Sequence, residues 1–159
     1  MKTIVISFIA VMALWVMTAC VNDPDPSERT LSPGDKCPAF FVVMNDGSVF
    51  DSTLPDDKLT VILFFNTDCP DCRRELPLVQ SLYEQSSDSV RFVCISREED
   101  AERVSHYWAE NNLTLPYSAQ TDRYVYSLFA DSGIPRTYIV NKEGYITSTR
   151  LSNLQSITP

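Results

Sequence analysis

The stretch from Thr60 to Tyr83 constrains the fold more than any other part of the sequence. Five apolar residues from Val61 to Phe65 predict a strand that is buried on both faces, as in the centre of a parallel sheet. Polar residues then break the run, and helical spacing follows at Leu76, Val79, Leu82 and Tyr83. Cys69 and Cys72 therefore lie where a core strand gives way to a helix.

This position suits a reactive cysteine. A thiol at a helix N-terminus lies near unpaired backbone N–H groups and the positive end of the helix dipole, and both favour the thiolate. Disulfide exchange needs one exposed thiolate and a second thiol close behind it. The spacing therefore predicts Cys69 as the nucleophile and Cys72 as the resolving thiol. The alternatives are a zinc half-site, for which His106 is the one histidine, and an inert structural pair.

These features resemble the thioredoxin superfamily: the strand, the cysteine pair, Pro77 inside the helix and Ile134-Pro135 before a later apolar strand. The segments 34–40 and 72–77 are similar to its membrane-tethered TlpA/ResA-type thiol–disulfide oxidoreductases, and the likeness covers roughly 31–148. The resemblance implies an α/β, thioredoxin-like fold: a central mixed sheet flanked by helices, with an N-terminal β-hairpin. Residues 151–159 leave room only for a shortened C-terminal helix.

The resemblance also implies roles in the site. It places Pro135 in the cis form, facing the cysteines, and lets the backbone of Ile134 pair with an extended substrate segment. Arg136 could read substrate charge, although a solvated arginine is the simpler expectation. The expected substrate-binding residues are Pro70, Asp71, Ile134 and Arg136.

Two family features are missing, because Asp68 replaces an aromatic residue and Leu63 replaces a buried acid. Proton removal from Cys72 then needs another base, and Glu75 is the candidate, with an ordinary exposed helix carboxylate as the alternative. Charges near Cys69 act in both directions. The acidic side chains of Asp68 and Asp71 oppose its ionisation. The basic side chains of Arg73 and Arg74 favour it.

Local patterns predict the remaining elements. An Asp46-Gly47 turn joins extended segments 40–43 and 48–50 as a hairpin. Ser96 and Glu99 have capping-box spacing and predict a helix start after a strand at 90–95. Further predictions are an extended piece at 113–117, a helix capped by Thr121 or Asp122, and a closing hairpin of 137–140 and 145–148.

Two other cysteines need separate explanations. Cys94 lies in an apolar run and is predicted to be an inert core thiol. Cys37 is either free, paired with Cys94, or paired with an external thiol. Trp108 and Tyr107 are predicted to lie in the core rather than in a ligand site.

The N-terminus indicates the compartment. Lys2 precedes an uncharged apolar segment, and Met17-Thr18-Ala19-Cys20 resembles the lipobox of bacterial lipoproteins. We therefore expect a signal peptide at 1–19, lipidation at Cys20, an unstructured proline-rich tether at 20–33 and a thioredoxin-like domain at 34–159. The alternative is an uncleaved membrane anchor. Both place the domain at the bacterial cell envelope, facing the periplasm.

Composition narrows the function. A length of 159 residues with 44% hydrophobic content fits one domain, and the net charge of −8 argues against nucleic acid as a partner. We expect a monomer without metal or organic cofactor that exchanges disulfides with protein substrates, in the reducing direction by resemblance, with a membrane reductase as electron donor. Two rival functions are a peroxiredoxin-like thiol peroxidase and a copper-delivery protein of the SCO type.

Overall fold

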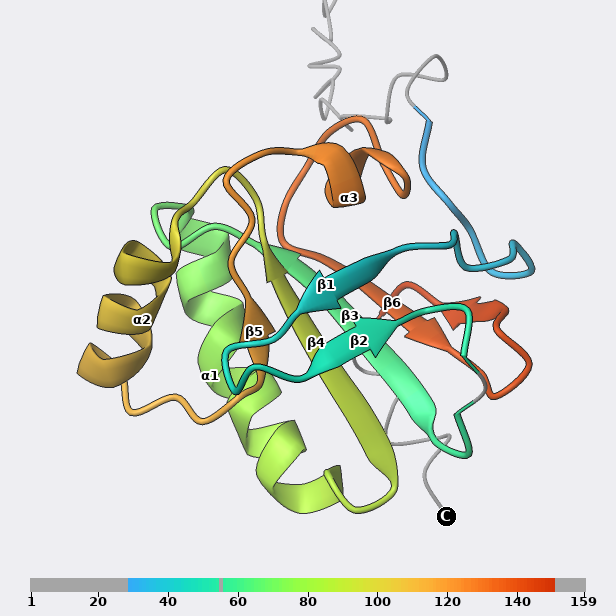
Figure 1. Ribbon diagram of the computed structural model, residues 1–159, viewed down its shortest axis with the longest axis horizontal. Coiled ribbons are helices and arrows are strands. Elements are labelled where there is room, and N and C mark those ends of the chain that lie inside the picture. The colour runs from blue at the N-terminus through green and yellow to red at the C-terminus, as the bar shows by residue number, and fades with distance from the viewer. Residues whose placement is uncertain (1–28, 55, 151–159) are drawn as a thin grey trace, which may run out of the picture.

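The computed structural model describes residues 29–54 and 56–150 (Figure 1). In this part of the chain a two-stranded hairpin precedes a five-stranded sheet with helices on its faces. The strands are β1 (Phe41–Val43), β2 (Val49–Asp51), β3 (Leu59–Phe65), β4 (Val90–Ser96), β5 (Tyr117–Ser118), β6 (Arg136–Val140) and β7 (Ile146–Ser148). The helices are α1 (Pro70–Ser86), α2 (Ala101–Glu110) and α3 (Tyr124–Ser127).

The five-stranded sheet is mixed, in the order β5-β4-β3-β6-β7. β4 is parallel to both β3 and β5, whereas β6 is antiparallel to β3 and β7. β3 and β4 are joined by α1, which is the crossover that a parallel pair requires. The mixed sheet, the flanking helices and the N-terminal hairpin agree with the predicted fold class.

The core has two layers because side chains alternate along β3. Val61, Leu63 and Phe65 pack in the cluster formed with α1 and α2. Ile62 and Phe64 pack in the cluster formed with the hairpin and α3. Figure 1 shows the hairpin in front of the sheet and α1 behind it. β3 is thus buried on both faces, as its continuous apolar run predicts.

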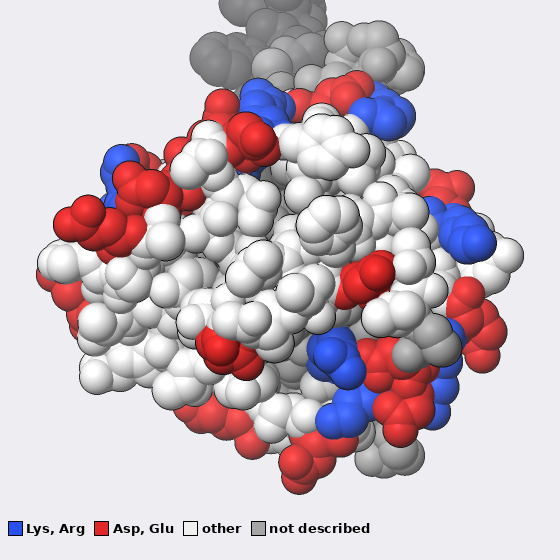
Figure 2. Space-filling model, in the orientation of Figure 1, with Lys and Arg blue, Asp and Glu red and all other residues white. Residues whose placement is uncertain are grey.

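The outward side of the hairpin carries exposed apolar side chains at Phe41, Val43 and Val49. Figure 2 shows this face of the molecule as mostly uncharged, with acidic and basic groups gathered toward its edge. The inward side chains of Phe40, Val42 and Met44 belong to the core, so the hairpin is the outer layer over the sheet.

The start of α2 differs from the predicted capping box. β4 runs through Ser96, and the N-cap is Asp100, whose side chain accepts a hydrogen bond from the Arg103 N–H at 2.8 Å. Glu99 is buried and accepts hydrogen bonds from Thr67 instead. The prediction of Ser96 as the cap was wrong because this strand extends one residue beyond its apolar run.

The N-cap of α3 is Arg123 rather than Thr121 or Asp122. Asp122 nonetheless accepts a hydrogen bond from the Tyr124 N–H at 2.8 Å, which orders the approach to the helix. The cap prediction was therefore wrong by one residue, although a carboxylate does bind the first turn.

Residues 29–31 of the predicted tether are hydrogen-bonded to the domain. The Leu31 N–H donates to the Phe129 carbonyl at 2.9 Å, and the Asp131 N–H donates to the Arg29 carbonyl at 3.0 Å. For residues 29–31 the expectation of an unstructured tether was wrong, because they pair with the segment before the cis-proline loop. The signal peptide, Cys20 and the shortened C-terminal helix lie outside the described residues.

Candidate active site

The loop between β3 and α1 presents Cys69 at the helix start. Cys69 is the N-cap of α1 and has an extended backbone, and its carbonyl accepts the Arg73 N–H at 3.0 Å. Asn66 shapes the loop, because its carbonyl accepts the Cys69 N–H at 3.1 Å and its side chain accepts the Asp68 N–H at 2.9 Å. The Cys69 side chain is half-buried, so its sulfur remains within reach of a partner.

Cys72 lies one turn further along α1 and is fully buried. Burial raises the pKa of the Cys72 thiol to about 12, with smaller contributions from Cys69 and Glu75, while a backbone hydrogen bond with Asn66 acts in the opposite direction. At neutral pH this sulfur is a protonated thiol. The pair therefore consists of an accessible sulfur and a sealed one.

The Ile134–Pro135 peptide bond is cis, as the resemblance implies. The Cys69 thiol donates to the Ile134 carbonyl at 3.6 Å, which places the cis-proline loop directly against the helix start. Ile134 and Pro135 are both half-buried. Segments 65 residues apart in the chain thus meet at Cys69.

Glu75 follows Cys72 by one turn of α1 and is half-buried. The Thr137 hydroxyl donates to its carboxylate at 3.4 Å. Burial raises the pKa of Glu75, and the hydrogen bond from Thr137 partly offsets this effect. Glu75 and Pro135 line one cavity of about 290 Å³, together with Thr30. Glu75 is therefore not the fully exposed carboxylate of the alternative interpretation.

Arginines pair with both acidic residues that flank Cys69. Asp68 forms ion pairs with Arg73 and Arg103, and Asp71 pairs with Arg74. All of these side chains are more than half exposed, so each pair contributes only about 0–1 kcal/mol to stability. Pairing nonetheless reduces the net negative charge near the sulfur. Arg103 comes from α2, and no local pattern predicts this contact.

The four predicted substrate-binding residues lie around Cys69 in two groups. Pro70 and Asp71 are exposed at the start of α1, and Ile134 and Arg136 belong to the cis-proline segment. Arg136 is held internally, since its guanidinium donates to the Ser132 carbonyl at 2.7 Å and to the Thr30 hydroxyl at 2.9 Å.

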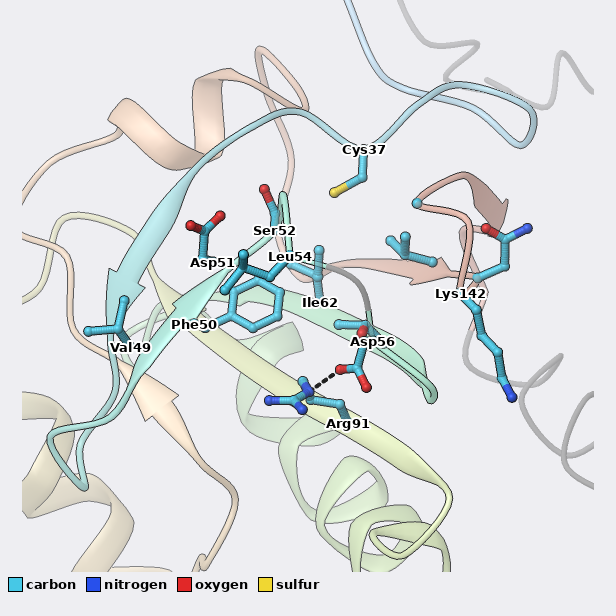
Figure 3. Close-up of a pocket in the computed structure, with 14 residues that line it drawn as sticks. Cys37, Val49, Phe50, Asp51, Ser52, Leu54, Asp56, Ile62, Arg91 and Lys142 are labelled. Carbon is cyan, nitrogen blue, oxygen red and sulfur yellow. Dashed lines mark hydrogen bonds and ion pairs between the residues drawn. The ribbon is translucent and has the colours of Figure 1, made fainter.

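Cys37 and Cys94 lie on opposite faces of the sheet, which excludes a disulfide between them in this structure. Burial raises the pKa of Cys94 to about 12 and that of Cys37 to about 11. Cys37 lies at the rim of a cavity of about 190 Å³ (Figure 3). The Arg91–Asp56 ion pair also lines this cavity. Because their pKa values are raised, Cys37 and Cys94 are poor nucleophiles at neutral pH.

Trp108 and Tyr107 pack against the core, as predicted. Within residues 29–54 and 56–150, side chains of histidine, cysteine, aspartate and glutamate form no cluster suited to a metal ion. None of the helices in this part of the chain is long and apolar enough to cross a membrane.

The sequence model of a family described as thioredoxin-like matches residues 56–146, more than half of the chain. The chain belongs to the thioredoxin superfamily. Its relatives include sporulation thiol-disulfide oxidoreductase A of Bacillus subtilis, which is 28% identical over 120 residues, covering 72% of each chain.

A second relative is the thiol-disulfide oxidoreductase ResA of Bacillus subtilis, 24% identical over 75% of this chain and 67% of its own. The fold is similar to the thioredoxin domain of a thiol-disulfide oxidoreductase from Bacteroides vulgatus. That comparison has a TM-score of 0.70 and 19% identity, and it covers 82% of this chain and 100% of the other. Within the thioredoxin superfamily the chain is a TlpA/ResA-type enzyme.

Sequence reasoning missed Glu99 and Thr67, which lie just behind this site. Glu99 is a buried carboxylate, and it contacts Thr67 in the loop that carries Cys69. Thr67 precedes Cys69 by two residues, but its partner lies 32 residues away. Only the capping-box spacing drew attention to Glu99, and it indicated a different role.

Proposed function

We propose that the protein is an extracytoplasmic thiol–disulfide oxidoreductase that exchanges disulfides with protein substrates through Cys69 and Cys72. The main support is the difference between the two sulfurs. Cys69 is accessible and lies 3.6 Å from the Ile134 carbonyl, whereas Cys72 is fully buried one turn behind it. Such a pair attacks with one sulfur and resolves with the other.

In the reducing direction, the Cys69 thiolate attacks a substrate disulfide. One substrate sulfur becomes bonded to Cys69, and the other leaves as a thiolate that takes up a proton. Cys72 then loses its proton and attacks the Cys69 sulfur, which releases the second substrate sulfur. Two electrons pass to the substrate, and a Cys69–Cys72 disulfide remains for a membrane reductase to reduce.

Glu75 is proposed as the acceptor of the Cys72 proton. Its raised pKa, caused by burial, makes it a better base than an exposed glutamate, and the same cavity reaches Pro135. The buried acid of other thioredoxins is Leu63 here, so Glu75 takes over the proton transfer.

An extended substrate segment is proposed to lie along the cis-proline loop. Ile134 offers its backbone at this edge, and Pro70 and Asp71 are exposed on the other side of Cys69. Pairing of backbone with backbone accepts many sequences, which suits an enzyme with protein substrates. Arg136 orders the loop through the Ser132 carbonyl and contributes positive charge at its rim.

Trapping tests the proposed function. In the full-length chain carrying Cys72→Ser, the mixed disulfide on Cys69 cannot be resolved, so partner proteins stay attached and are released by a reductant. Mass spectrometry of these adducts identifies the partners. Cys69→Ser in the same background is the control and should capture nothing.

The rival functions predict different activities for the wild-type protein. A thiol–disulfide oxidoreductase reduces insulin disulfides, a peroxidase consumes hydrogen peroxide, and a copper carrier binds copper ions stoichiometrically. We expect activity in the first assay alone. Peroxide turnover, or copper binding without insulin reduction, would replace this proposal with the corresponding rival.

A further inference from the structure

Two loops interlock behind the active site. One follows β3 and carries Cys69, and the other follows β4 and carries Glu99. The Arg97 N–H donates to the Phe65 carbonyl, and the Asn66 side chain donates to the Arg97 carbonyl, both at 2.9 Å. Backbone and amide contacts therefore hold the second loop beside the first.

The Glu99 side chain reaches from the second loop into the first. It is 1% exposed. One carboxylate oxygen accepts the Thr67 N–H at 2.8 Å, and the other accepts the Thr67 hydroxyl. Hydrogen bonds to an ionised carboxylate are stronger than neutral ones, and a buried carboxylate is retained only where it is paired. Glu99 thus accepts hydrogen bonds from both donors of Thr67, its backbone N–H and its hydroxyl.

Charged side chains extend this contact to the residue beside the nucleophile. Arg103 lies 3.6 Å from the Glu99 carboxylate and also pairs with Asp68. Arg73 pairs with Asp68 from the other side and donates to the Thr67 carbonyl. Negative and positive groups alternate through this cluster, so both residues that precede Cys69 are fixed.

We propose that Glu99 is a positioning residue for disulfide exchange. It holds Thr67 and, through Arg103, Asp68, and so fixes the Cys69 sulfur relative to Cys72. This inference deepens the proposed function and rests on it. Glu99 does not touch the reacting sulfurs, and its effect is carried by the loop.

The position of Glu99 should affect the equilibrium between the Cys69 and Cys72 thiols and their disulfide. When glutathione disulfide oxidises the protein, two protein thiols and one glutathione disulfide give one protein disulfide and two glutathione thiols. The equilibrium constant depends on how closely the Cys69 and Cys72 sulfurs are held together, because two thiols held side by side have a higher effective concentration toward each other. A loosened loop therefore lowers this constant and makes the protein more oxidising.

The test is a glutathione redox titration of the full-length protein at a temperature well below unfolding. Glu99→Leu removes both acceptors, and we expect the equilibrium constant to fall about tenfold, equivalent to about 30 mV. Thr67→Val removes only the hydroxyl contact and should lower the constant about threefold, a fraction of that effect. Thr67→Ser keeps the hydroxyl and should match the wild type.

Gln80→Ala supplies a matched structural control. Gln80 is buried near the middle of α1, accepts the backbone N–H groups of Thr114 and Leu115, and has no contact with the Cys69 loop. Its loss should lower the free energy of unfolding and leave the redox equilibrium unchanged. If Glu99→Leu does not fold, Thr67→Val and Thr67→Ser carry the comparison.

The outcomes separate the inference from the proposed function. If Thr67→Val and any folded Glu99 variant are less stable but titrate like the wild type, Glu99 is merely structural and the inference is overturned. If the wild type itself forms no reversible Cys69–Cys72 disulfide, the proposed function fails, and the inference fails with it. A lowered equilibrium constant in Glu99→Leu or Thr67→Val, together with a wild-type constant in Thr67→Ser, supports the inference.

Discussion

Cys72 and Glu75 are one helical turn apart, and burial affects both. It raises the pKa of the thiol to about 12 and raises that of the carboxylate as well. A thiol that holds its proton this firmly does not attack a mixed disulfide unaided at neutral pH. In the proposed mechanism, Glu75 lowers this barrier by accepting that proton as the sulfur attacks.

Glu75→Gln is expected to slow resolution of a mixed disulfide about a hundredfold, which is the lower range for loss of an acid–base group. The attack of Cys69 on the substrate should be little changed, because Glu75 acts on the second step. Rapid-mixing kinetics with a chromogenic disulfide separate the two steps. Glu84→Gln, an exposed position on the same helix, is the control.

The same substitution has a pH signature. Because burial raises the pKa of Glu75 in the folded state, the folded protein holds this proton more firmly than the unfolded chain. The resulting stabilisation is complete below the unfolded value of about 4.3 and is lost as pH rises through the folded pKa. Urea unfolding should therefore show that Glu75→Gln gains stability relative to wild type as pH rises above about 4.3. A constant difference would contradict the assignment.

Single residues were predictable where their chemistry is encoded by short spacing. Cys69 and Cys72 are three residues apart, and the proline that follows Ile134 precedes an apolar run, so both features are visible in the sequence. Glu99 and Thr67 lie 32 residues apart. No local pattern indicates that a carboxylate after one strand will turn inward to bind the loop after another.

Among the helices, α2 depends on its N-cap, Asp100, which directly precedes it. Asp100 accepts the Arg103 N–H at 2.8 Å, one of the donors that lack a partner at a helix start. Asp100→Ala should lower the free energy of unfolding by about 1 kcal/mol, the usual effect of losing an N-cap. Urea denaturation measures this change.

Asp100→Asn keeps an acceptor at the same place and should lower the free energy of unfolding by only about 0.3 kcal/mol. Ser96→Ala tests the rejected cap. The Ser96 hydroxyl accepts the Gln120 N–H at 2.8 Å, so its loss affects the β5 side of the sheet rather than α2. Equal destabilisation by Asp100→Asn and Asp100→Ala would argue against capping.

The structure explains which elements the sequence predicts well. β3, α1 and β4 follow from their apolar patterns, because burial on both faces of a strand leaves a continuous run and burial on one face of a helix leaves a periodic one. Boundaries such as the end of β4 at Ser96 depend on partners elsewhere in the sheet, here the pairing of Ser96 with Phe65. Local sequence does not contain that information.

At the scale of the whole molecule, the membrane anchor is the main remaining prediction. If Cys20 is lipidated, the protein purified from membranes carries an acyl-modified N-terminal cysteine, and mass spectrometry detects it. Cys20→Ala should abolish this modification. Stable anchoring generally needs more than one acyl chain.

Processing of the N-terminus distinguishes the two forms of anchor. If the wild type is a lipoprotein, the Cys20→Ala variant should not be processed normally. Its apolar leader, residues 1–19, should then remain attached. A wild-type protein that retains residues 1–19 at the membrane would instead support the uncleaved anchor. N-terminal sequencing of the wild type distinguishes the two.

The ordered segment at Arg29 and Thr30 limits where the enzyme can work. Thr30 is bound by Arg136 and lines the same cavity as Glu75 and Pro135, so the chain enters the domain beside the candidate active site. Eight residues lie between Cys20 and Arg29, and even fully extended the nine residue-to-residue steps span only about 30 Å. With Cys20 held in a bilayer, the reactive sulfur would stay within a few nanometres of the lipid headgroups, favouring partners whose disulfides lie close to the membrane surface over those free in bulk solution.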